Sequence, residues 1–154
     1  MQTLNAALAK CKIVPVVVVH DVAHAAPLAN ALANGGLTVV EVTMRTPAAL
    51  AIISAMVKAR PDLIVGAGTV LNAEHLQQAR DAGAHFGVSP GLNAELREAV
   101  LASGWPFIPG CATPSEAMAL VEHGFEVVKL FPAEVVGGIN MLKSIGGPLP
   151  HIKF

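Results

Sequence analysis

The sequence carries little charge and no marked excess of either sign. Charged residues make up 14% of its 154 residues, and the formal net charge is −1 at pH 7. A protein that binds nucleic acid presents a basic surface to the phosphates, and this composition provides none. We therefore expect no nucleic-acid partner.

Long hydrophobic runs are also missing, although 53% of the residues are hydrophobic and the mean hydropathy is +0.58. The longest runs, such as residues 13–19, are too short to span a bilayer. Residues 1–12 lack the apolar core and the small-residue cleavage site of a signal peptide. We therefore expect a cytoplasmic protein with no membrane partner, long enough to bury one large core.

Cysteine is scarce, and the two residues, Cys11 and Cys111, have neither metal-ligand nor redox spacing. We interpret both as structural thiols. His20 and His24 are four residues apart, a spacing that brings two imidazoles together on one helix. Here, however, they fall on a strand end and a helix start. The sequence therefore indicates no metal and no cofactor.

Apolar runs typical of strands alternate with helical patterns along the whole chain. Strands are predicted at residues 13–19, 37–43, 63–67, 86–89, 106–109 and 125–131, with the start of a seventh at 152–154. N-capping side chains mark the starts of the intervening helices, and the capping residues are Asp21, Thr46, Asn72, Asn93 and Thr113. We predict one α/β domain over residues 1–154, built from six strand-helix units with a parallel sheet and right-handed crossovers.

Two architectures fit this alternation, an open doubly wound sheet and an eight-stranded barrel. The stretch Gly66-Ala67-Gly68 suggests a dinucleotide loop, but no third glycine or downstream acidic residue completes the motif. Polar residues stand near the carboxyl ends of several strands, where barrel active sites assemble. They are Glu41, Thr43, Arg45, Thr69, Ser89, Thr113 and Lys129. The barrel is therefore favoured.

Two strands each carry one charged residue in an otherwise apolar run, and the charges are opposite. Alternation places Lys129 on one face with Val127 and Phe131, and Glu41 on one face with Val39. A structural interpretation is a buried ion pair, although such pairs stabilise proteins weakly. A chemical interpretation is a nucleophilic amine that forms a Schiff base with a ketone while the carboxyl group moves protons.

Five motifs together resemble the bacterial 2-keto-3-deoxy-6-phosphogluconate (KDPG) aldolases, which also act on 4-hydroxy-2-oxoglutarate (KHG). In this chain they read EVTMRT at 41–46, VGAGTVL at 65–71, SPGL at 89–92, IPG at 108–110 and VKLFPAE at 128–134. The resemblance covers essentially the whole chain. It implies a (β/α)8 TIM barrel of the class I aldolase type, a metal-independent lyase without cofactor, and a homotrimer.

The resemblance also implies site roles. Lys129 would form the Schiff base with pyruvate or the keto acid, and Glu41 would act as general acid and base. Arg45 would hold the substrate carboxylate through its guanidinium fork. Thr69, Pro90 and Phe131 would line the pocket; as alternatives, these three form turns or pack, and Arg45 is a solvated loop charge.

The chain departs from the family pattern where the seventh strand begins. Family members continue through strands seven and eight, whose following turns bind the substrate phosphate. We expect open edges on the first and sixth strands, and interpret the sequence as a truncated product, an incomplete record, or a piece completed by another chain. Three alternatives remain: an inactive or association-dependent fragment, an aldolase for the galactonate epimer, and another barrel in which Lys129 is an electrostatic clamp.

Overall fold

A computed structural model describes residues 2–154, in which short strands alternate with helices. The strands are β1 (Val16–Val17), β2 (Val39–Thr43), β3 (Ile64–Gly68), β4 (Phe86–Val88), β5 (Phe107–Ile108), β6 (Gly110–Cys111) and β7 (Lys129–Leu130). The helices are α1 (Gln2–Lys10), the 3-10 helix η1 (Val22–His24), α2 (Ala25–Asn34), α3 (Ala49–Ala59), α4 (Ala73–Asp81), α5 (Ala94–Ser103), α6 (Pro114–Glu122) and α7 (Gly138–Gly146). Among the described residues no helix is long and apolar enough to cross a membrane.

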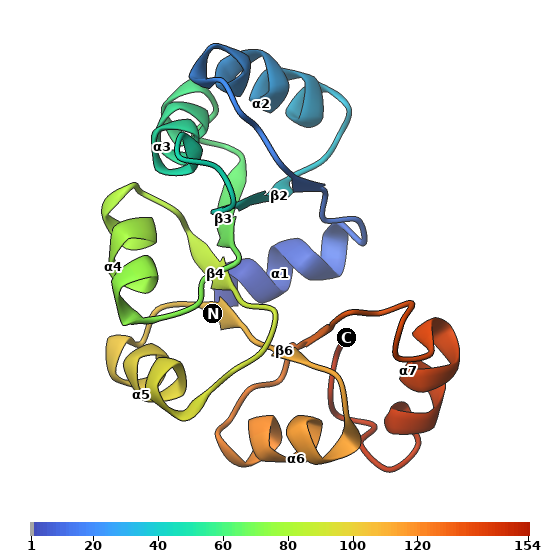
Figure 1. Ribbon diagram of the computed structural model, residues 1–154. Coiled ribbons are helices and arrows are strands. Elements are labelled where there is room, and N and C mark those ends of the chain that lie inside the picture. The colour runs from blue at the N-terminus through green and yellow to red at the C-terminus, as the bar shows by residue number, and fades with distance from the viewer. Residues whose placement is uncertain (1) are drawn as a thin grey trace.

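The strands follow one another around a central axis in sequence order. One parallel sheet has the order β1-β2-β3-β4-β5, and β6 pairs with β7 in a second parallel sheet. Figure 1 shows the strands at the centre and helices α2 to α7 around their outer side. A doubly wound sheet reverses its strand order and carries helices on both faces. The predicted α/β barrel arrangement is therefore confirmed, and the doubly wound alternative is excluded.

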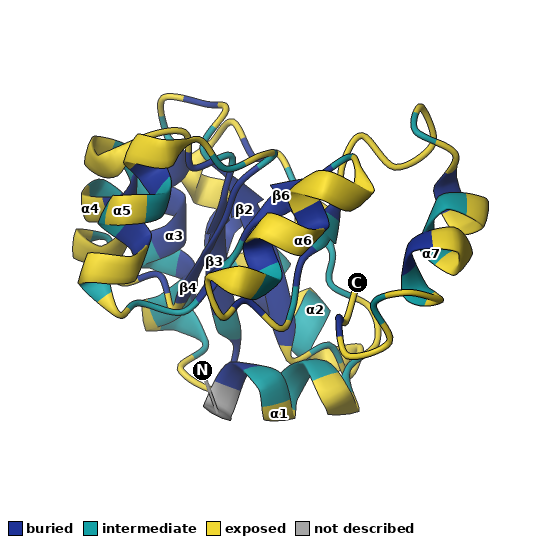
Figure 2. Ribbon diagram, turned by 90° about the horizontal axis from the view of Figure 1, so that it is seen from below, coloured by how far each residue is buried: buried dark blue, intermediate teal, exposed yellow. Residues whose placement is uncertain are grey.

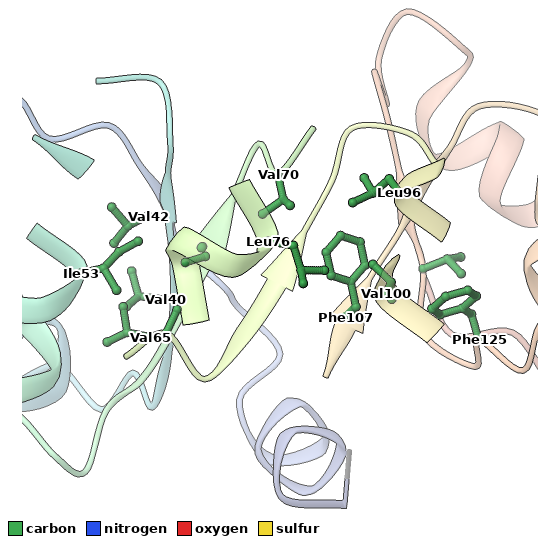
Figure 3. Close-up of a cluster of buried hydrophobic side chains, with 14 of the residues drawn as sticks. Val40, Val42, Ile53, Val65, Val70, Leu76, Leu96, Val100, Phe107 and Phe125 are labelled. Atoms are coloured by element: carbon green, nitrogen blue, oxygen red, sulfur yellow. The ribbon is translucent and has the colours of Figure 1, made fainter. Parts of the chain in front are cut away.

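The two faces of the strands bury different side chains. Val40 and Val42 of β2 join a large cluster with helix residues such as Ile53, which Figure 3 shows between strands and outer helices. Val39 belongs to a smaller cluster with Phe86 and other residues of the inner face. This alternation follows from the period of two along a strand. It places Glu41 on the same face as Val39, as predicted, and this is the inner face.

Helix α1 was not predicted, and it covers the amino-terminal end of the barrel. Leu4 of α1 is buried against Val39 and Phe86, which begin β2 and β4. Figure 2 shows α1 lying across this end of the molecule. The spacing of Leu4, Ala7 and Leu8 is the helical period that identifies such an element in the sequence.

Several predicted strands are shorter in the structure. Residues 13–19 give only β1, and residues 125–131 give only β7, while residues 152–154 contribute a single bridge between Val127 and Lys153. An apolar extended run becomes a strand only where a neighbour completes its hydrogen bonds, and β1 pairs with β2 alone. In place of the single strand predicted at residues 106–109, the structure has two short strands, β5 and β6. They lie on either side of Pro109, which has no N–H group to donate to a ladder.

The predicted helix caps are confirmed at four of five positions. The side chains of Asp21, Asn72 and Asn93 accept backbone N–H groups at the starts of η1, α4 and α5, and Thr113 forms a complete capping box. The prediction for Thr46 was wrong. Its hydroxyl donates to the carbonyl oxygen of Val19 at 2.8 Å and so ties two strand-helix units together, while α3 begins three residues later.

Candidate active site

The fold brings Glu41 and Lys129 together although 88 positions separate them in the sequence. Lys129 Nζ lies 3.2 Å from Glu41 Oε1 and 3.3 Å from Oε2, so the ammonium donates to both carboxylate oxygens. Glu41 is the central residue of β2, where it pairs with Gly66, and Lys129 begins β7, where it pairs with Gly110. The predicted approach of acid and amine is confirmed.

The two partners differ in exposure. The Glu41 side chain is 5% exposed and the Lys129 side chain is 27% exposed. Lys129 Nζ also lies 5.6 Å from the centroid of the Phe131 ring, within the range of a cation–π contact. The acid is thus held inside the barrel, while the amine remains open to a molecule that enters.

An open cavity of about 840 Å³ lies beside this pair. Glu41 and Lys129 contribute to its wall, and most of the other lining side chains are apolar, including Val88 and Ile108 of the inner strand face and Leu8 of α1. Lys12 and Lys153 also reach its wall. A concave, mostly apolar space with a few convergent polar groups is the usual form of a small-molecule site. The predicted substrate-binding residues do not line this cavity, and these are Arg45, Thr69, Pro90 and Phe131.

Glycines make the room for these inner side chains. A Cβ atom on Gly66 would lie 2.6 Å from Cε2 of the Phe86 ring, and one on Gly68 would lie 2.7 Å from both Cγ and Cδ of Glu41. The sequence argued against a dinucleotide loop for this Gly-Ala-Gly stretch, but its packing role was not predicted. The signal was available, because glycine inside a strand marks a close approach by another group.

The other predicted site residues follow the carboxyl ends of the strands. Arg45 comes two residues after β2; it is exposed and has no hydrogen bond or ion pair with the residues described. Thr69 follows β3 at φ 62°, an uncommon conformation for a β-branched residue. Pro90 follows β4 and lines a second cavity of about 150 Å³ together with Phe131, a residue that is 43% exposed.

Strain of the kind seen at Thr69 costs about 1–3 kcal/mol and is concentrated at functional sites.

All six predicted site residues lie within β2 or β7 or within two residues of the carboxyl end of β2, β3, β4 or β7. It establishes direct contact only among Glu41, Lys129 and Phe131. Among the described residues no three His, Cys, Asp or Glu side chains gather in a form that would hold a metal ion.

Cys111 lies beside this region but on the buried side. It pairs with Leu130 next to the Gly110–Lys129 pair and is 2% exposed. Burial, together with the nearby charge of Glu116, raises the pKa of the Cys111 thiol to about 11. A thiol in this state is a poor nucleophile, so we do not expect Cys111 to react with a substrate at this edge.

The model of one protein family, described as KDPG and KHG aldolase, matches residues 4–154. The chain belongs to this family. Among similar proteins, the 2-dehydro-3-deoxy-phosphogluconate aldolase of Pseudoalteromonas atlantica is 49% identical over 142 residues, which cover 92% of this chain and 66% of the relative.

Two crystal structures of family members are similar over nearly the whole chain. The 2-keto-3-deoxy-6-phosphogluconate aldolase of Zymomonas mobilis ZM4, solved with 3-phosphoglycerate, has a TM-score of 0.94 and 43% identity, covering 100% of this chain and 73% of that one. The KDPG aldolase of Legionella pneumophila, solved with pyruvate captured as a covalent carbinolamine intermediate, has a TM-score of 0.92 and 42% identity, covering 97% and 72%. The chain thus spans about two thirds to three quarters of the length of these aldolases.

Proposed function

We propose that this chain carries the catalytic centre of a class I aldolase, with Lys129 as the Schiff-base amine and Glu41 as the general acid and base. The observation that supports the proposal is the Lys129–Glu41 contact at 3.2 Å on the wall of an open, mostly apolar cavity. An amine that is only partly exposed and has a carboxylate beside it is arranged for attack on a ketone carbon.

The first half of the reaction joins the substrate to the enzyme. The Lys129 ammonium first passes a proton to Glu41; the Nζ lone pair then attacks the C2 carbonyl carbon of a 2-keto acid, and the carbonyl oxygen takes that proton from Glu41 to give a carbinolamine. Glu41, which contacts Nζ through both oxygens, accepts the proton lost by nitrogen and returns a proton to the leaving hydroxyl. Water departs, and a protonated imine remains.

The second half breaks a carbon–carbon bond. The C4 hydroxyl loses its proton to Glu41, the C3–C4 bond breaks to release an aldehyde, and the electron pair flows into the imine to give an enamine. Protonation at C3 and hydrolysis of the imine then release pyruvate and restore the free amine. A properly positioned acid–base group contributes about 10²–10⁴-fold to the rate of such steps.

The remaining predicted residues would bind the substrate. Arg45 is an exposed guanidinium at the end of β2 with no ion-pair partner among the residues described, so it is free to bind a carboxylate with two hydrogen bonds. Thr69, Pro90 and Phe131 would line the pocket around the imine. The strained backbone of Thr69 and the contact of Phe131 with the ammonium support these roles.

We propose 2-keto-3-deoxy-6-phosphogluconate as the substrate, with pyruvate and glyceraldehyde 3-phosphate as products, because similar aldolases are named for that substrate. Cleavage of 4-hydroxy-2-oxoglutarate to pyruvate and glyoxylate is a second activity, in keeping with the description of the family. A cytoplasmic homotrimer is the proposed form. Exposed Met118, Val135 and Ile139 are apolar side chains that an association would cover, and light scattering on the purified protein measures the assembly.

Borohydride trapping tests the proposal. The protein is incubated with pyruvate, reduced, digested and mapped by mass spectrometry. We expect one reduced pyruvate adduct on Lys129, and a coupled assay for pyruvate should report cleavage of the sugar acid phosphate. A folded protein that takes up no adduct would instead support a non-catalytic fragment or a barrel in which this lysine is an electrostatic clamp.

Matched variants identify the amine. Lys129→Arg keeps the positive charge but removes the nucleophile, so we expect no adduct. Lys153→Arg changes another lysine on the wall of the same cavity and should label as the native protein does. An adduct that survives Lys129→Arg would mean that a different amine reacts.

A further inference from the structure

We infer that Gly68 is a positioning residue for Glu41. Because glycine has no side chain, the carboxylate of Glu41 can occupy the space that a Cβ atom at position 68 would fill. This inference rests on the proposed function for its catalytic meaning. The close packing of Gly68 against Glu41, from which the inference is drawn, depends only on the geometry of the fold.

The carboxylate of Glu41 crosses onto the neighbouring strand. In the β2–β3 ladder Glu41 pairs with Gly66, and Gly68 lies two residues further along β3, opposite Thr43. A Cβ atom on Gly68 would meet Oε1 of Glu41 and would lie 2.7 Å from both Cγ and Cδ. The Glu41 side chain therefore leans diagonally over Gly68, a relation that long side chains adopt across paired strands.

Space explains this glycine, and backbone conformation does not. The φ angle of Gly68 lies outside the left-handed region, so alanine could adopt the same backbone. The backbone is also fixed by the strand, because the N–H of Met44 donates to the Gly68 carbonyl oxygen at 2.8 Å. A side chain added here cannot move aside with its own backbone, so the carboxylate must move.

Displacement of Glu41 has a defined consequence. Three consecutive atoms of its side chain, Cγ, Cδ and Oε1, would lie too close to the added methyl group, so a small turn of the carboxylate does not relieve the contact. The whole Glu41 side chain must therefore adopt another rotamer, and the 3.2 Å contact between Oε1 and Lys129 Nζ is then lost. A shift of about 1 Å in a catalytic group costs about 10²-fold in rate.

The test uses Gly68→Ala in the full chain and separates attack from proton transfer. Trapping by borohydride reports whether Lys129 still forms an imine with pyruvate. Exchange of the pyruvate methyl protons in D₂O, followed by NMR, reports whether a base removes a proton from that imine. We expect the extent of trapping at saturating pyruvate, measured after imine formation has reached equilibrium, to stay within about twofold of native, and exchange to be slower by about 10²-fold. Gly146→Ala, at a position with open space on α7, is the matched control and should leave both unchanged.

A double-mutant cycle with Glu41→Ala decides whether Gly68 acts through Glu41. In that background the clashing atoms are gone, so Gly68→Ala should cause no further loss of exchange and no further fall in the urea midpoint. An equal fold-loss in both backgrounds overturns the inference, as does exchange in Gly68→Ala within threefold of native. If the native protein traps no pyruvate, the proposed function fails, and the urea midpoints of the same four proteins still decide the packing claim.

Discussion

Removal of the ammonium should destabilise the protein because it leaves a nearly buried carboxylate without its partner. In Lys129→Met the carboxylate of Glu41, only 5% exposed, loses both contacts with nitrogen. Coulomb's law at 3.2 Å gives about 5 kcal/mol for the pair when the effective dielectric constant is about 20. Because Lys129 keeps 27% exposure, solvent weakens this interaction, and we expect a loss of about 2–4 kcal/mol at neutral pH.

Urea denaturation measures this loss through the fluorescence of Trp105, the single tryptophan of the sequence. With a slope of about 2 kcal/mol per molar urea, the midpoint should fall by about 1–2 M. The control is the double variant Glu41→Gln/Lys129→Met, which removes both charges and should recover at least about 1 kcal/mol of the loss. If Lys129→Met shifts the midpoint by less than 0.5 M, or if the double variant is no more stable than the single one, the carboxylate is not held in a dry environment and the reasoning is wrong.

Other residues give further predictions. Gly66→Ala would force a Cβ atom into the Phe86 ring and should destabilise the protein by about 1–3 kcal/mol. Gly146→Ala should be neutral or slightly stabilising, and equal urea midpoints for the two variants would contradict this. Iodoacetamide should modify Cys11 before Cys111. A hydrogen bond from the backbone of Thr38 lowers the pKa of the Cys11 thiol, whereas burial and a raised pKa should protect Cys111 until urea unfolds the chain. Mass mapping of the modified peptides gives the order of reaction. Asn93→Ala should lose about 1 kcal/mol in urea denaturation because the cap on α5 disappears, and a loss near zero would show that water replaces it.

The elements that local chemistry specifies could be predicted from the sequence. Asn72, Asn93 and Thr113 cap their helices because the acceptor and the N–H groups it satisfies lie within three residues. The inner and outer faces of β2 also follow from local alternation. Such features depend on a few consecutive residues and need no knowledge of distant packing.

Features that depend on distant partners were predicted less well. Residues 13–19 are almost entirely apolar, yet only Val16 and Val17 form a strand, because a ladder needs a neighbour whose register the sequence does not reveal. Thr46 precedes a proline as an N-cap would, but its hydroxyl finds the Val19 carbonyl of another unit. In both cases a tertiary contact outweighs a local preference.

The charged pair of the candidate site could be predicted from the sequence, but the glycine that makes room for it could not. Opposite charges in two apolar strands identify Glu41 and Lys129 from the sequence alone, since a charge on such a face needs a partner. The close contact that favours glycine at position 68 could not be predicted from the sequence, because it depends on how the Glu41 side chain leans across from the neighbouring strand. Sequence patterns assign residues to faces, whereas contacts across strands depend on register.

The ion pair by itself fits both a structural role and the proposed catalytic role, and its surroundings bear on the choice between them. A buried pair that serves stability surrounds its charges with further donors, because each carboxylate oxygen has two lone pairs to satisfy. Among the described residues Glu41 receives side-chain hydrogen bonds from Lys129 alone. The acid therefore lies beside a partly exposed amine on the wall of an open cavity. In the proposed mechanism, this position lets a hydroxyl or water in the cavity approach the carboxylate, as general-base catalysis requires.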